Sequence, residues 1–318
     1  MSKHATTSAT NPTAESTVSH FLDVDDLTDD ELAEVFSTAG ELKVAHRAGK
    51  SHPVLANQTL AMLFEKPSTR TRVSFETGMT QLGGHAIYLG PDTTHLDHGE
   101  PVADTARALS RYVDAVMARV FDHDALEAMA SHASVPVING LSDDAHPCQT
   151  LADLFTIYEQ FDGFEDVSVA WVGDGNNVAQ SFAVGAAMAG LDLTMATPEG
   201  YEPAEGVLAR ADARGQAPEV VNDPEAAVEG ADVVYTDVWV SMGEEDEREE
   251  KLGDFDGFQV SDDLLANAPE AAVMHCLPAH RGEEITGDVL ESEQAIVWEQ
   301  AENRMHTQKA LIAHLLGE

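Results

Sequence analysis

The chain turns from an expected strand into an expected helix at Phe64-Glu65-Lys66-Pro67-Ser68-Thr69-Arg70-Thr71-Arg72. The apolar run 58–64 is typical of a buried strand, and residues 68–81 are expected to be helical until Gly83-Gly84 ends the helix. Ser or Thr at the start of a helix can cap it, and the free N–H groups and dipole there favour an anion. The two arginines add donors suited to phosphate oxygens. The turn therefore predicts an anion site.

A capped surface helix with basic side chains would show the same run. Basic residues are scarce, however, because Lys and Arg number 17 against 57 Asp and Glu, which gives a formal net charge of -40. Arginines gathered at one place in so acidic a chain favour the anion site. Residues 68–72 lack the Gly and Lys of the phosphate loop of P-loop enzymes.

The acidic composition argues against a nucleic-acid or anionic-membrane surface, since both need a basic footprint. Charge spread along the chain predicts a halophilic cytoplasm, where salt screens the repulsion; an ordinary acidic protein is the alternative. No apolar run approaches the roughly 18–20 residues that span a bilayer. The polar segment 1–19 lacks the order of a secretory signal and is expected to be a flexible tail. The 2 cysteines are expected to be free thiols in a reducing cytoplasm.

Strand and helix alternate on both sides of this turn. We expect strands at 58–64, 85–89, 115–118, 135–139, 167–172, 191–196, 233–236 and 272–275, and helices at 28–48, 68–81, 105–112, 124–132, 146–159, 179–189 and 304–316. Thr28 and Glu31 have the spacing of a capping box. The alternation predicts an α/β protein with two doubly wound parallel-sheet domains, 20–150 and 151–303, joined by bridging helices. The C-terminal helix 304–318 is expected to join the first domain.

The run 64–72 resembles the carbamoyl-phosphate motif of the aspartate and ornithine carbamoyltransferases. Two further stretches, 104–119 and His146-Pro147-Cys148-Gln149, resemble other motifs of this family. The resemblance implies that domain 20–150 binds carbamoyl phosphate, that His146 and Arg119 contact its carbonyl oxygen, and that Gln149 holds its nitrogen. The residues implied around the phosphate are Ser68, Thr69, Arg70, Thr71 and Arg119.

In this family a residue ahead of the second motif reaches into the site of a neighbouring subunit. His95, in Thr94-His95-Leu96, has the matching place, although an ordinary loop histidine is the alternative. The resemblance implies a homotrimer, or a multiple of trimers, with sites between subunits.

The acceptor is implied by two motifs of the ornithine branch. Asp237-Val238-Trp239-Val240-Ser241-Met242-Gly243 resembles the loop that closes over the amino acid, and His275-Cys276-Leu277-Pro278 resembles a segment that the aspartate enzymes lack. The resemblance implies that domain 151–303 binds L-ornithine. The implied contacts are Asp237, Ser241, Met242 and Asn177 with ornithine, and Cys276, the Leu277 carbonyl and Arg304 with the carbamoyl group.

Three other features of the sequence suggest different chemistry. Gly173-Asp174-Gly175 suggests a dinucleotide loop, but Val178 stands where a small residue is needed. His146, Cys148, His275 and Cys276 suggest zinc, but Cys-x-x-Cys spacing is absent. A covalent Cys276 is unnecessary, because an amine attacks carbamoyl phosphate directly. We therefore expect no metal and no organic cofactor.

The expected reaction gives citrulline and phosphate and is reversible, so its direction in arginine metabolism stays open. The resemblance implies that Cys276, next to an acidic partner, helps to orient and deprotonate the attacking amine. The group that takes the proton stays open, and the leaving phosphate is a candidate. Alternatives are an N-acetylornithine or putrescine carbamoyltransferase and a non-catalytic binding protein on the same fold.

Overall fold

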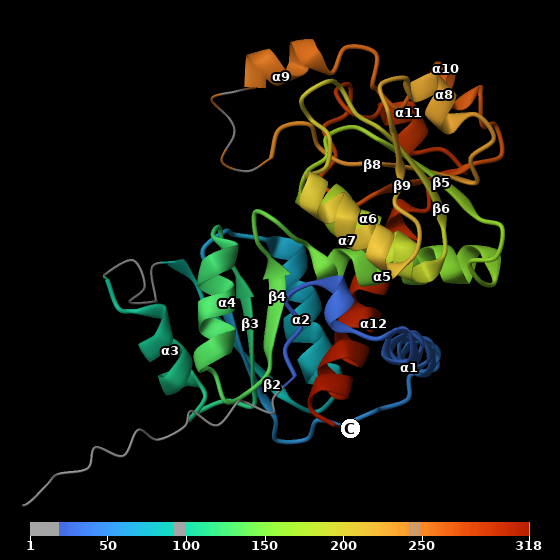
Figure 1. Ribbon diagram of the computed structural model, residues 1–318. Coiled ribbons are helices and arrows are strands. Elements are labelled where there is room, and N and C mark those ends of the chain that lie inside the picture. The colour runs from blue at the N-terminus through green and yellow to red at the C-terminus, as the bar shows by residue number, and fades with distance from the viewer. Residues whose placement is uncertain (1–18, 92–98, 242, 244–245, 247, 318) are drawn as a thin grey trace, which may run out of the picture.

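The computed structural model describes residues 19–91, 99–241, 243, 246 and 248–317. Its strands form two parallel sheets, a four-stranded sheet in the order β2-β1-β3-β4 and a five-stranded sheet in the order β7-β6-β5-β8-β9. Figure 1 shows the two sheets in separate halves of the molecule, with α5 at the junction between the halves. The predicted α/β fold with two parallel sheets is confirmed.

The elements follow the expected alternation. The N-terminal half contains η1 Val24–Asp26, α1 Asp29–Arg47, β1 Thr59–Phe64, α2 Thr69–Gln81, β2 His85–Leu89, α3 Val102–Leu109, β3 Ala115–Arg119, α4 His123–His132, β4 Val137–Leu141 and α5 Pro147–Phe161. The C-terminal half contains β5 Ser168–Val172, α6 Asn177–Ala189, β6 Asp192–Ala196, α7 Glu205–Arg214, β7 Glu219–Val221, α8 Pro224–Val228, β8 Val233–Thr236, α9 Arg248–Asp254, α10 Asp262–Leu265, β9 Ala272–His275, α11 Gly287–Leu290 and α12 Val297–Leu315.

The expected strands are all present, and the capping box of α1 is confirmed, since Thr28 and Glu31 cap each other. Two helix boundaries were wrong. The helix expected at 105–112 is α3, which begins earlier, directly after Pro101, and the last helix begins at Val297, so that Arg304 lies inside it rather than at its start. The domain limits 20–150, 151–303 and 304–318 stay predictions, and most of the expected tail 1–19 lies outside the described residues.

The central strands bury both faces. On β1, Leu60, Met62 and Phe64 join the main core, which also contains residues of α1, α2, α5 and α12. The alternate residues Ala61 and Leu63 join a separate core under α3 and α4. This period of two, with both sides apolar, is the pattern of a parallel strand covered by helices on each face.

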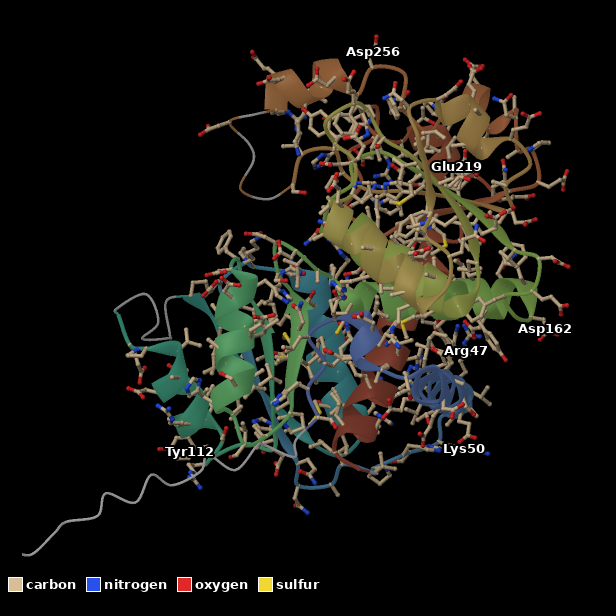
Figure 2. The ribbon with its side chains drawn as sticks, in the orientation of Figure 1. Arg47, Lys50, Tyr112, Asp162, Glu219 and Asp256 are labelled. Carbon is tan, nitrogen blue, oxygen red and sulfur yellow. The ribbon has the colours of Figure 1, made fainter. Side chains whose placement is uncertain are left out.

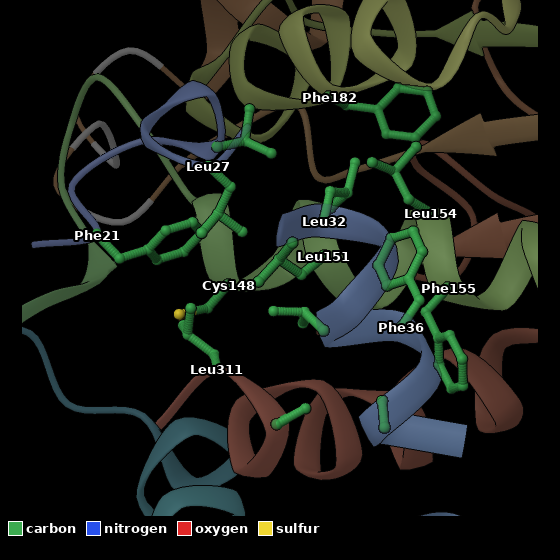
Figure 3. Close-up of a cluster of buried hydrophobic side chains, with 14 of the residues drawn as sticks. Phe21, Leu27, Leu32, Phe36, Cys148, Leu151, Leu154, Phe155, Phe182 and Leu311 are labelled. Carbon is green, nitrogen blue, oxygen red and sulfur yellow. The ribbon is translucent and has the colours of Figure 1, made fainter. Parts of the chain in front are cut away.

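The main core continues from one half of the molecule into the other (Figure 3). The segment from Phe21 to Phe36 packs against α5, which contributes Leu151, Leu154 and Phe155, while Phe182 comes from α6 and Leu311 from α12. Removing one such buried side chain down to Ala typically costs about 2–5 kcal/mol. Because α5 and α12 are buried along most of their length, they fix the two sheets relative to each other.

The outer surface carries the acidic excess. Figure 2 shows Asp162 and Asp256 at the periphery, and Glu219 is exposed as well. No helix among the described residues is long and apolar enough to cross a membrane. Exposed like charges repel one another over a Debye length of about 10 Å at 0.1 M salt, which shrinks to about 3 Å at 1 M.

We expect the protein to gain stability as salt rises, because screening reduces the self-repulsion of a chain with net charge -40. Thermal unfolding followed by circular dichroism in 0.1 M and in multimolar KCl measures this. Sucrose at matched osmolality is the control, since it leaves the charges unscreened. Equal melting temperatures at both salt concentrations would contradict the halophilic interpretation.

Candidate active site

A cleft of about 960 Å³ lies at the point in each sheet where the strand order reverses. In the first sheet, β1 has β2 on one side and β3 on the other. In the second sheet, β5 has β6 on one side and β8 on the other. Ligands of open parallel sheets bind at such points, beyond the carboxyl ends of the strands. The cleft is lined there by Ser68 after β1, Arg119 at the end of β3, Asn177 after β5 and Asp237 after β8. Residues from both halves therefore face one cavity.

The N-terminus of α2 opens into this cleft. Ser68 caps the helix by accepting from the Thr71 N–H at 3.3 Å, and its hydroxyl lies 3.2 Å from the Thr71 hydroxyl. Arg304 of α12 donates to the same Thr71 hydroxyl at 3.0 Å. Thr69 and Arg70 line the cleft, whereas Thr71 is buried behind it. This end of the cleft combines free backbone N–H groups with cationic side chains, as an anion requires.

Three guanidinium groups converge at this end. Arg119 and Arg304 are buried, and Arg70 lies close enough to affect both of their pKa values. Burial first, and then repulsion from Arg304 and Arg70, lowers the pKa of Arg119 to about 9. The Nε atoms of all three arginines are buried and make no hydrogen bond to another described residue. Like charges held together with unused donors favour the binding of an anion between them.

Arg72 corrects part of the sequence interpretation. Both arginines of the run were expected to supply donors for phosphate, but Arg72 turns away from the cleft. It is exposed, pairs with Glu76 at 3.0 Å one turn along α2, and lies 3.9 Å from the ring centre of Tyr88. Residues one apart on a helix point in directions about 100° apart, and two apart nearly opposite, so Arg70 and Arg72 cannot share a ligand easily.

His146 and Gln149 stand at the start of α5, beside the arginines. Burial first, and then the charges of Arg304, Arg119 and Arg70, lowers the pKa of His146 well below its usual value. The imidazole is therefore neutral and donates from one nitrogen only. Its Nδ1 and the Oε1 of Gln149 are buried without a partner among the described residues. The pair thus offers the cleft a polar imidazole nitrogen and a carboxamide acceptor.

The opposite end of the cleft is built around Asp237. Its Oδ1 accepts from the Cys276 thiol at 2.9 Å, and its Oδ2 accepts from Asn176 Nδ2 at 2.9 Å. Burial, followed by the charge of Asp237, raises the pKa of Cys276 well above its usual value. Cys276 is therefore a protonated thiol that donates a hydrogen bond. A thiol in this state serves poorly as a nucleophile or as a base for an amine, a role the sequence left open for Cys276.

The remaining expected contacts are distributed around this acceptor end. Asn177, Ser241 and Leu277 line the cleft, and Asn177 also donates to the Ser142 carbonyl at 2.6 Å. Leu277 has a φ of 62°, in the left-handed region that non-glycine residues rarely adopt, and strain of this kind gathers at functional sites. His95 and Met242 lie outside the described residues.

Sequence reasoning missed several residues of the cleft wall. Lys66 is buried beside Asp143, with its ammonium 4.4 Å from the Phe121 ring centre. Lys251 and Asp174 form a buried pair at 2.9 Å. Scarcity of lysine in an acidic chain was a usable signal for Lys66, which stands inside the anion motif. The pairing of Lys251 with Asp174 had no local signal, because the partners come from separate elements.

The four residues that suggested a zinc site do not form one cluster, and the glycine that suggested a dinucleotide loop has a packing role. Among the described residues, Asp237, His275 and Cys276 have possible metal-ligand atoms within 4.8 Å of one another, as do His280, Glu283 and Glu284. Cys148 is in neither group and lies in the main core. Gly175, which suggested a dinucleotide loop, has a packing role: a Cβ there would lie 2.5 Å from the Pro203 nitrogen.

Comparison with known proteins covers almost the whole chain. The family model "Aspartate/ornithine carbamoyltransferase, carbamoyl-P binding domain" matches residues 19–159, and the "Asp/Orn binding domain" model matches residues 165–315. An ornithine carbamoyltransferase of Haloquadratum walsbyi is 63% identical over 300 residues, covering 94% of this chain and 98% of the relative. The solved ornithine carbamoyltransferase from Pyrococcus furiosus superposes with a TM-score of 0.91 at 52% identity, covering 95% of this chain and 98% of that one. The Thermus thermophilus structure gives 0.85 and 45%, covering 94% and 99%.

We expect Arg70→Ala to bind inorganic phosphate about 10–100-fold more weakly than the wild type, since charged hydrogen bonds contribute about 1.5–3 kcal/mol. Isothermal titration calorimetry in constant salt measures the affinity. Arg72→Ala is the matched control, because it removes an equal charge from the same helix outside the cleft. Equal loss of phosphate affinity in both variants would mean that the affinity depends only on the net charge of α2.

Proposed function

This chain belongs to the aspartate/ornithine carbamoyltransferase family, and we propose that its cleft transfers the carbamoyl group of carbamoyl phosphate to the δ-amino group of L-ornithine, giving L-citrulline and phosphate. The observation that carries this proposal is the pairing within one cavity of a three-arginine anion end with a carboxylate–thiol end. The first end fits a phosphate, and the second fits an amine. The relatives named ornithine carbamoyltransferase support the choice of acceptor.

Carbamoyl phosphate occupies the anion end. Its phosphate binds the α2 N-terminus through Ser68, Thr69 and Arg70, and Arg119 spans phosphate and carbonyl oxygen. The carbonyl oxygen also receives hydrogen bonds from Thr71, His146 and Arg304. Negative charge grows on this oxygen as the amine attacks, and donors already in place lower the barrier without reorganising. The neutral state of His146 lets it donate without adding a further charge to the arginine cluster.

The carbamoyl nitrogen needs acceptors, since its N–H groups would otherwise be buried without partners. Gln149 Oε1, which has no partner among the described residues, and the Leu277 carbonyl supply them. These contacts orient the planar carbamoyl group, so that its carbon faces the acceptor end of the cleft.

Ornithine occupies the acceptor end. Its chain end is held by Asn177, Ser241 and Met242, and its amines face Asp237. The δ-amine must lose a proton before it attacks, because a free alkylamine is protonated at neutral pH. Cys276 donates a hydrogen bond to Asp237 and therefore orients the carboxylate. The ammonium group releases this first proton to solvent as ornithine binds. The neutral amine then attacks the carbamoyl carbon and forms a tetrahedral intermediate. Its collapse breaks the carbon–oxygen bond to phosphate, and the departing phosphate takes the second proton from the nitrogen.

The protein acts in a reducing cytoplasm, and the two free cysteines support this proposal. The reaction is written here towards citrulline, and phosphate cleavage of citrulline is the same reaction reversed. Rates measured in both directions distinguish synthesis from breakdown of arginine.

We expect citrulline to form from ornithine at a kcat/KM at least about 100-fold above that for putrescine, N-acetylornithine or aspartate, because buried polar groups left unpaired by the wrong acceptor penalise it. A colorimetric assay for carbamoylated amines in high salt measures all four. Faster turnover of another amine would mean that this amine, and not ornithine, is the acceptor. Failure with every amine would favour the non-catalytic alternative.

A trimer with shared sites completes the proposal. β2 is an edge strand, and Ile87 on it is 40% exposed, while Val73 on the neighbouring α2 is 54% exposed. An apolar edge of this kind is commonly covered by another subunit. His95, which follows β2 in the sequence, would then reach the neighbour's anion end.

We expect Arg70→Ala and His95→Ala variants to complement each other. When the two inactive proteins are dissociated, mixed equally and reassembled, about a quarter of the sites of a cyclic trimer combine an intact Arg70 with a neighbour's intact His95. Activity should recover to about that fraction. Each variant reassembled alone is the control, and absence of recovery in verified mixed trimers would place each site within one subunit.

A further inference from the structure

Asp153 lies beneath the cleft and touches no solvent. It is fully buried on α5, one turn after Gln149. Its Oδ1 accepts from Gln149 Nε2 and from Gln300 Nε2, each at 2.7 Å, and its Oδ2 lies 2.8 Å from the Tyr235 hydroxyl. The mechanism above does not use Asp153, although three elements that carry site residues, α5, α12 and β8, meet on it.

The bond from Gln149 decides which way its carboxamide faces. A carboxamide has a donating and an accepting end, and the two are exchanged by rotating the terminal group by 180°. Because Oδ1 of Asp153 engages Nε2, Oε1 is the end that remains free, and it is buried without a partner among the described residues. The rotated amide would place two acceptors against each other at Asp153 and present N–H donors to the cleft.

We infer that Asp153 is a positioning residue that holds the Gln149 carbonyl oxygen ready to accept the N–H of the carbamoyl group. This inference rests on the proposed function, since the carbamoyl group supplies that N–H. An N–H donor at this place would repel the N–H groups of the substrate. The Gln149 orientation therefore favours a carbamoyl group over a ligand that carries an acceptor at the same position, such as an acyl phosphate with a carboxylate.

Gln300 repeats the arrangement towards the acceptor end. Its Nε2 is held by the same Oδ1, and its Oε1 accepts from the His275 backbone N–H at 3.0 Å. His275 precedes Cys276, and Tyr235 stands shortly before Asp237 on the neighbouring strand. One buried carboxyl group therefore fixes the orientation of two carboxamides. It contacts β8 directly through Tyr235 and is linked to β9 through Gln300.

The arrangement tolerates a change of protonation. Burial raises the pKa of Asp153 to about 7, while the hydrogen bonds from both glutamines and Tyr235 and the charge of Arg304 oppose that rise. When Asp153 is ionised, Tyr235 donates to it. When Oδ2 is protonated, it donates to the Tyr235 oxygen, and Oδ1 accepts from both glutamines in either state.

Two variants of Asp153 separate orientation from packing. Asp153→Asn retains Oδ1 as an acceptor for both glutamines, and its Nδ2 can donate to Tyr235. Asp153→Ala removes the acceptor and frees the Gln149 amide to rotate. We expect Asp153→Ala to lose on the order of 100-fold in kcat/KM for carbamoyl phosphate, as for a misplaced binding group, and Asp153→Asn to lose less than about tenfold. Thr156→Val is the matched control, since Thr156 is buried on α5, accepts from Asn303, and lies outside the cleft.

The double variant Asp153→Ala/Gln149→Ala supplies the readout that packing alone would not move. If Asp153 acts through Gln149, the double variant should be about as slow as Gln149→Ala by itself. Multiplied losses would overturn the inference, and so would a loss in Asp153→Asn equal to that in Asp153→Ala. Circular dichroism checks that each variant is folded, and if Asp153→Ala does not fold, the same comparison is made with Asp153→Ser.

Failure of this inference differs from failure of the proposed function. If the wild type and Thr156→Val carbamoylate ornithine while Asp153→Ala matches them, only the positioning role is wrong. If the wild type itself carbamoylates no amine, the proposed function is wrong, and the positioning role falls with it.

Discussion

Repulsion among three buried or half-buried guanidinium groups is the constraint on which the site depends. Arg70, Arg119 and Arg304 stand together in a protein whose net charge is -40, although the acidic residues are placed elsewhere. The first two arginines are fixed by a helix start and a strand end, and the third comes from the last helix. The folded chain holds the three guanidinium groups together against their electrostatic repulsion, and a bound anion offsets this repulsion. The folded state thus favours an anion at this cluster before any ligand arrives.

The parallel sheets explain why the second half of the site faces the first. Each sheet has a crevice where its strand order reverses. The buried helices α5 and α12 hold the two sheets so that these crevices face each other. Neutral hydrogen-bonding groups then fill the space between charge centres. His146 is kept uncharged by burial and then by the arginines, and Cys276 is kept protonated by burial and then by Asp237. A shared cavity therefore separates an electropositive end from an electronegative end.

Sequence predicted the parts of this arrangement that local patterns specify. Strand and helix alternation gave the α/β class, and Ser68 marked the start of α2, because caps and apolar periodicity are short-range signals. Arg72 was misassigned, since its direction depends on Glu76 and Tyr88. The resemblance supplied Arg304, but its contact with Thr71 spans 233 residues. Asp153 was missed because nothing in its neighbourhood along the chain shows that it meets Gln300 and Tyr235.

The place of α12 in the chain has a consequence during synthesis. Leu311 and Ile312 are fully buried in the core that α1, α2 and α5 share, yet the whole second sheet is synthesised between the N-terminal sheet and these residues. At about 5–20 residues per second, the N-terminal sheet waits for roughly 10 s or more with an open flank before this helix arrives. A nascent chain that ends before α12 lacks both this core helix and Arg304. The synthesis of α12 therefore completes the main core and the three-arginine cluster together, and until then the apolar surface that α12 covers stays exposed.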